Sequence, residues 1–236
     1  MVYQYRMVQS NTRRAATTAG IIALALMGAA MTPAAADDTD EISDDAWYAL
    51  ADDAADEIEA TDWEAISAAD GCVLVDVTVR EVVDPQANTD AGAPEDLAVP
   101  VVEREEVCPS GTTTLTSDLA FGGDMQTNVS PGSDCNGTSG PGTICISRSG
   151  SYVATSWQYN GSVTVSAYLK LYDISTGASG CPTGDSLASS STSSYSNGTR
   201  RSLTVYSPSY DGYSSYIWRY VGLGHYTAWG SACGIF

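Results

Sequence analysis

The side chains of this sequence best suited to chemistry are its tyrosines. Between residues 151 and 236 there are eleven Tyr and three Trp residues, while Phe occurs only at the terminus. A tyrosine combines an apolar ring with a polar hydroxyl, and a rigid Tyr surface with Ser and Gly neighbours binds sugars or proteins at low entropic cost. The alternative is that Tyr simply suits strands. The candidate binding residues are Tyr168, Tyr172, Tyr206, Tyr210, Tyr213 and Tyr216.

A β-hairpin is expected to position the first two of these tyrosines. Residues 152–172 alternate between apolar and polar side chains, and the three-residue loop 159–161 gives the register that places apolar residues opposite one another. Tyr168 and Tyr172 then point away from the apolar row. That row consists of Val163, Val165, Ala167, Leu169 and Leu171.

Further short strands are expected over residues 202–207, 216–221 and 225–229, with Tyr206 outward in the first of them. Residues 181–200 are rich in Ser, Thr and Gly and predict a loop. Several short strands with turn signals at close spacing predict a mainly β fold. The expected architecture is an antiparallel β-sandwich or a small barrel.

Charge divides the chain into three segments. Residues 1–36 carry three Arg and no acid, residues 37–107 carry 23 acidic residues against two Arg, and residues 108–236 carry six Asp against five basic residues. Such asymmetry predicts three separate roles, with residues 108–236 as the β domain. The net charge of −19 argues against a nucleic-acid partner, because phosphates repel carboxylates.

The first segment, residues 1–36, has the three parts of an export signal peptide. Arg6, Arg13 and Arg14 precede a short apolar run, and Ala34 to Ala36 form a small-residue cleavage site before Asp37. The arginine pair leaves general secretion and twin-arginine export both open. No later apolar stretch is long enough to span a membrane, so no membrane insertion is expected after signal removal. The sequence predicts a secreted, extracellular protein.

The acidic segment predicts one or two short helices and then a strand pair. Ser43 can cap a helix whose apolar stripe runs from Trp47 to Ile58, and a capping box over residues 61–64 begins a second helix. Alternation then predicts strands from Val73 and back through Val107. The returning strand suits an exposed edge through its acidic residues Glu103, Glu105 and Glu106. The segment is a retained solubilising region, a removable propeptide or an acidic binding arm.

The cysteines fit export to an oxidising compartment. Six Cys residues allow 15 pairings, and we favour Cys72–Cys108, Cys135–Cys145 and Cys181–Cys233. The expected strand pair places the first two opposite each other. The spacings lack Cys-x-x-Cys and the chain has one His, so no metal site and no cofactor are predicted.

Catalytic patterns are mostly missing, which favours a protein that is not an enzyme. His225 is the sole histidine, and no Gly-x-Ser-x-Gly motif accompanies it. A glycosidase would need two neighbouring carboxyls, and the sequence alone does not exclude a spatial pair. The carboxyls of the last segment are Asp118, Asp124, Asp134, Asp173, Asp185 and Asp211.

The function most consistent with these patterns is extracellular binding. We expect a secreted, non-enzymatic β protein that binds a glycan or a protein surface outside the cell. A secreted hydrolase that uses a carboxylate pair or His225 is the first alternative. A protease inhibitor or bacteriocin-like toxin released from an acidic precursor is the second.

Overall fold

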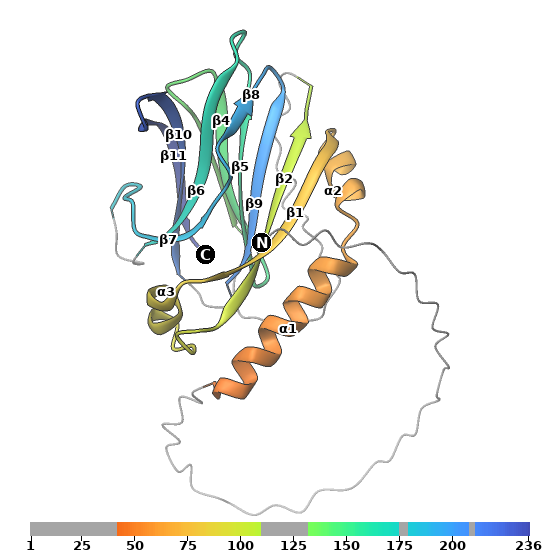
Figure 1. Ribbon diagram of the computed structural model, residues 1–236, viewed down its shortest axis with the longest axis vertical. Coiled ribbons are helices and arrows are strands. Elements are labelled where there is room, and N and C mark those ends of the chain that lie inside the picture. The colour runs from red at the N-terminus through yellow and green to blue at the C-terminus, as the bar shows by residue number, and fades with distance from the viewer. Residues whose placement is uncertain (1–41, 110–131, 175–178, 208–210) are drawn as a thin grey trace, which may run out of the picture. The chain divides into compact units, whose positions relative to one another are not determined.

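The computed structural model describes residues 42–109, 132–174, 179–207 and 211–236 (Figure 1). The expected signal peptide, Tyr210, Asp118 and Asp124 lie outside the described residues. The helices are α1 (Asp44–Ala60), α2 (Trp63–Ala69) and α3 (Pro85–Asp90). The strands are β1 (Val73–Val83), β2 (Ala98–Val107), β3 (Gly132–Gly137), β4 (Gly142–Ser149), β5 (Tyr152–Tyr159), β6 (Val165–Ile174), β7 (Asp185–Ser189), β8 (Ser193–Tyr195), β9 (Thr199–Tyr206), β10 (Gly212–Gly222) and β11 (His225–Ile235).

These strands form two antiparallel sheets, which confirms the mainly β prediction and selects the sandwich over the closed barrel (Figure 1). Sheet A has the order β1-β2-β9-β5-β4-β3, and sheet B has the order β11-β10-β6-β7, with β8 also paired to β6. Alternate side chains of both sheets fill the space between them. Trp157 and Leu203 from sheet A and Leu169 and Ile217 from sheet B are fully buried there.

Helices α1 and α2 cover the opposite face of sheet A (Figure 1). Ser43 caps α1 as predicted, because its hydroxyl accepts the Ala46 N–H, and Ile58 lies in the apolar cluster against the sheet. The second helix begins one residue later than the capping box suggests. Asp62 is its cap and accepts the Ala65 N–H at 2.9 Å. The carboxylate also stabilises the positive end of the helix.

The strand pair of the acidic segment and all three disulfides agree with the predictions. β1 and β2 pair antiparallel from Val73 opposite Val107 to Val83 opposite Ala98. That register brings Cys72 to Cys108. The other disulfides join Cys135 to Cys145 and Cys181 to Cys233.

The prediction of an exposed edge at Glu103, Glu105 and Glu106 was wrong. β2 lies between β1 and β9, so it is an interior strand. Glu103 and Glu106 are 7% and 0% exposed, and Glu105 is half-buried. Their charges are tolerated because β9 supplies Arg200, 2.7 Å from Glu106, and Arg201, 2.6 Å from Glu103 and also bonded to Glu105. β1 is the edge strand instead.

The predicted hairpin over residues 152–172 was also wrong. β5 lies in sheet A between β4 and β9, whereas β6 lies in sheet B beside β10. Residues 160–164 therefore cross from one sheet to the other, and Val163 is 69% exposed rather than paired with Trp157. β5 is buried along its whole length and needs partners on both sides, which β4 and β9 provide.

Of two later segments predicted from turn and loop signals, one is confirmed and the other was wrong. The hairpin at residues 222–224 is confirmed and joins β10 to β11, with Leu223 in the left-handed region at φ 50°. Residues 181–200, predicted as a loop, contain β7 and β8, which pair with β6. Serine-rich strands were missed there because their partners, rather than their own propensity, hold them in the sheet.

Candidate functional site

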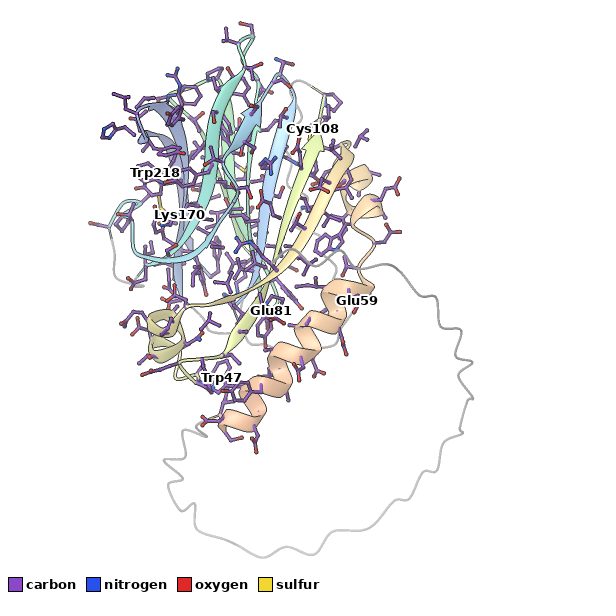
Figure 2. All side chains as sticks on the ribbon, in the orientation of Figure 1. Trp47, Glu59, Glu81, Cys108, Lys170 and Trp218 are labelled. Carbon is purple, nitrogen blue, oxygen red and sulfur yellow. A yellow bond between two sulfur atoms is a disulfide. The ribbon has the colours of Figure 1, made fainter. Side chains whose placement is uncertain are left out.

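The face of sheet B that points away from sheet A carries a continuous cluster of aromatic rings. β6, β10 and β11 are neighbours, and residues that alternate with the buried Leu169 and Ile217 point outward. Trp218 and Lys170 mark this side of the sheet in Figure 2. We call this surface the aromatic face, and its rings are Tyr168, Tyr172, Tyr216, Trp218, Tyr220 and Tyr226.

The register between strands brings these rings into contact. Tyr168 lies opposite Trp218, with ring centroids 6.4 Å apart and planes inclined by 16°. Tyr216, two residues before Trp218 on β10, also packs against the Trp218 ring, with the two ring centroids 5.7 Å apart. Tyr226 meets Tyr168 edge-on at 4.8 Å. Mutual packing fixes the rings before a ligand arrives, so that little side-chain entropy is lost on binding.

One end of the aromatic face is fastened by neighbouring structure. The rings of Tyr172 and Tyr216 make an edge contact at 5.7 Å, and the Lys170 ammonium lies 5.0 Å from the Tyr172 centroid. The Tyr216 hydroxyl donates to the Cys181 carbonyl, and the Cys181–Cys233 disulfide ties that segment to β11. Tyr172 is consequently only 7% exposed.

The other end of the aromatic face is open to solvent. Tyr220 is 39% exposed, and Tyr168, Trp218 and Tyr226 are half-buried. Burial raises the pKa of Tyr168, and the neighbouring Tyr226 raises it further, so the phenol stays neutral and keeps its hydroxyl proton. The Tyr226 hydroxyl lies 3.2 Å from that of Thr192. This end thus offers apolar ring surface bordered by hydroxyl groups.

Tyr168, Tyr172 and Tyr216, three of the six predicted binding residues, lie together on this face. Two others were expected at the surface and are buried instead. Tyr206 is 3% exposed because α1 covers that face of sheet A, and Tyr213 is 0% exposed between the sheets. Neither is available to a ligand, and the sixth, Tyr210, is not among the described residues.

The sequence reasoning did not name Trp218, Tyr220 and Tyr226 as binding residues. A signal for them existed, because Tyr216, Trp218 and Tyr220 alternate along one strand and Tyr226 follows the hairpin turn. Their alignment with Tyr168 depends on the pairing of β10 with β6, which are far apart in sequence. That pairing has no local signature.

Apart from the aromatic face, the carboxyls of Asp173 and Asp211 form a polar cluster. Burial raises the pKa of Asp173, and the charge and hydrogen bond of Asp211 raise it further, to about 7. A neighbouring carboxyl disfavours ionisation, so Asp173 keeps its proton up to near neutral pH. Of the aspartates considered from the sequence, these two form a spatial pair.

A small cavity adjoins Asp173. It lies between α1, α3 and the ends of β6 and β9, and Asp173, Asp84, Trp47, Leu187 and Val205 are among its lining residues. Its wall is mostly apolar. The arrangement places a carboxyl of raised pKa beside a mostly apolar cavity, a setting in which a carboxyl can act as a general acid near neutral pH.

The remaining candidate residues offer less. His225 is exposed at the start of β11 beside the turn. Across residues 42–109, 132–174, 179–207 and 211–236, no three His, Cys, Asp or Glu side chains gather as metal ligands. Among the described helices, none has the length and apolarity needed to cross a membrane.

Comparison with known proteins assigns the chain to no family. No model of a protein family matches the chain, and no curated protein matches its sequence.

Proposed function

We propose that this chain is a secreted, non-enzymatic protein that binds an extracellular glycan through the aromatic face. The observation that carries the proposal is the packing of six aromatic rings on one side of sheet B, with Tyr220 39% exposed at the open end. An exposed apolar patch of this kind on a folded protein usually marks an interaction site. The three disulfides fit an oxidising exterior, in agreement with the expected export signal.

The chemistry of the face favours a sugar as the ligand. The apolar faces of sugar rings stack on aromatic rings, and sugar hydroxyls exchange hydrogen bonds with phenols at the border. Tyr168 and Tyr226 supply both groups at the open end. Lys170 adds one positive charge near the fastened end, which suits a ligand with some acidic groups.

The test removes rings from the open end. Replacing Tyr168 and Tyr220 together by Ala should weaken binding to an insoluble glycan or cell-wall preparation about tenfold or more, because each anchor ring contributes more than about 1 kcal/mol. Tyr172 is avoided because its burial would confuse lost binding with lost folding. Tyr48→Ala is the matched control, since Tyr48 is 40% exposed but lies on α1.

The readout is the amount of protein retained by the glycan, with circular dichroism to check the fold. Loss of retention in the double variant, with Tyr48→Ala unchanged, supports the proposal. Equal retention by all three proteins would exclude the aromatic face. Retention by an extracellular protein but by no glycan would identify a protein surface as the partner class instead.

The carboxyl pair favours a hydrolase as the second candidate. Burial and the neighbouring Asp211 raise the pKa of Asp173 to about 7 beside a cavity, so Asp173 can act as a proton donor near neutral pH. Asp173→Asn should then abolish hydrolysis of any substrate found in a panel of glycans and esters. If activity is found and this variant keeps it, the pair is not catalytic.

The third candidate, an inhibitor or toxin released from an acidic precursor, has less support. Its release near residue 108 would require cleavage around Arg104, which is 2% exposed inside sheet A. The intact mass of the exported protein tests it directly. A mature N-terminus at Asp37 favours retention of the acidic segment, and one near Cys108 favours a precursor.

A further inference from the structure

β1 gives sheet A an apolar edge that is unpaired among the described residues. It is the last strand of the sheet, beside α2, and β2 is its sole partner in the described ranges (Figure 1). Val77, Val79 and Val83 on this strand are 38%, 52% and 48% exposed. The free N–H and C=O groups of an edge are a template for another strand. An eleven-residue edge with exposed valines is therefore a potential interaction surface.

The edge also carries features that restrict what can pair with it. A β-bulge interrupts the register between Leu74 and Asp76, and charges follow at Asp76, Arg80 and Glu81. In the described part of the chain neither Asp76 nor Arg80 takes part in an ion pair, and Arg80 donates to the Ser189 carbonyl at 2.6 Å. Bulges and charges prevent unspecific pairing at sheet edges. A partner strand has to match these charges.

The sequence of β1 matches itself. When two copies pair antiparallel about a two-fold axis perpendicular to the sheet, residues that lie opposite each other point to the same face. With the axis at Thr78, Asp76 lies opposite Arg80 of the second copy, and Val77 lies opposite its Val79. The β-bulge shifts the residues before Asp76 out of this alternation, so the regular register covers residues 76–80 of both copies.

Neighbouring registers lose this complementarity. With the axis at Val79, Asp76 lies opposite Val82, and with the axis at Arg80, the two arginines lie opposite each other. Like charges in directly opposed positions are destabilising, and opposite charges are stabilising. The charges of this edge thus select one register out of those that the valines alone would permit.

We propose that two copies of this chain pair through β1, with the two-fold axis at Thr78, so that the two six-stranded sheets become one continuous sheet. The second copy is the partner because its strand supplies an opposite charge to both Asp76 and Arg80 in this register. A two-fold axis perpendicular to the sheet leaves the direction of the sheet normal unchanged. Sheet B therefore lies on the same side in both copies.

This geometry has a consequence that rests on the proposed function, although the pairing itself does not. Both aromatic faces point in the same direction, so a dimer can engage two sites on one glycan surface. Simultaneous engagement raises the apparent affinity without a new contact. The pairing is tested without any ligand, so its failure and the failure of glycan binding are separate results.

The test is a charge swap followed by sedimentation analysis over a range of protein concentrations, with disulfides intact. The unaltered chain should dimerise. Asp76→Arg and Arg80→Asp each replace both cross-copy attractions by repulsions, so each should weaken dimerisation roughly tenfold to a hundredfold. The combined Asp76→Arg/Arg80→Asp variant restores opposite charges in the same register and should recover dimerisation.

A second pair of variants tests the apolar contribution. Val77→Lys places a charge in the centre of the pairing and should abolish the dimer, whereas Val163→Lys alters an exposed valine outside β1 and should leave it intact. Circular dichroism checks that every variant is folded. A chain that stays monomeric at all concentrations overturns the proposal. So does a dimer that tolerates Val77→Lys, or a combined charge variant that fails to recover.

Discussion

Replacing Arg200 by Met should destabilise the whole protein, because this arginine joins the acidic segment to the central strands. Its Nη2 lies 2.6 Å from the Asp70 carboxylate and its Nε lies 2.7 Å from that of Glu106. All three side chains are almost fully buried. Removing one partner of such a pair leaves a charge in a poorly solvated site, and the expected loss is about 3–5 kcal/mol.

That loss is a large fraction of the total stability of a domain, which is roughly 5–15 kcal/mol. In urea unfolding followed by tryptophan fluorescence, the midpoint should fall by roughly 1–2 M. Arg219→Met is the control, because Arg219 is half-buried and lies 4.7 Å from the Trp229 ring centroid. Losing that contact should remove less than about 1 kcal/mol.

The pH dependence makes the test specific for the ion pair. Burial alone would raise the pKa of Glu106, but its hydrogen bond to Arg200 and the charges of Arg104 and Arg200 outweigh burial and hold the pKa below the ordinary value of 4.5. A lowered folded-state pKa stabilises the protein above pH 4.5 and ceases to do so as the carboxyl protonates in acid. The deficit of Arg200→Met should shrink below that pH. Equal midpoints for the two arginine variants at pH 7 would refute the reasoning.

Two further predictions concern single residues. Asp173 has a pKa raised from 3.8 to about 7, so its contribution to stability is present below pH 3.8 and is lost as the pH rises through 7; Asp173→Asn should therefore raise the melting temperature at pH 8 and change it little in acid. Arg104 is 2% exposed, so trypsin should leave the oxidised, folded protein uncut after this residue and cut it there once the protein is reduced and unfolded; rapid cleavage of the folded protein, seen by mass spectrometry, would contradict the structure.

Features with a local signature were predicted well from the sequence. The Ser43 cap, the buried stripe of α1 and the turn around Leu223 depend on residues close together in the chain. The Cys72–Cys108 disulfide followed from one antiparallel register between neighbouring strands. The outward direction of Tyr168 and Tyr172 followed from alternation, although the hairpin assumed for it does not exist.

Features that depend on distant strands could not be predicted in the same way. Alternation shows that β5 and β6 are strands, but not that they belong to different sheets. Alternation shows that Tyr206 and Leu203 point to opposite faces of β9, but not that α1 covers the face to which Tyr206 points. It shows glutamates on β2, but not that the arginines of β9 lie beside them. In each case the decisive neighbour lies far away in sequence, so no window of the chain contains the information.

The same contacts bear on whether residues 37–107 stay in the mature protein. β2 pairs along β9 from Val101 opposite Val205 to Val107 opposite Thr199. Excising it would strip β9 of one partner and leave a new exposed edge. Arg200 would lose both of its carboxylate partners, because Asp70 and Glu106 belong to the excised segment.

The charge asymmetry of the sequence then has a structural reason. Part of the acidic excess of residues 37–107 neutralises arginines of the last segment inside one sheet, where unpaired charges are costly. A propeptide that leaves after folding would have to break these pairs and a disulfide. These contacts favour retention, which predicts that the mature protein keeps Cys72 linked to Cys108 within one uncut chain.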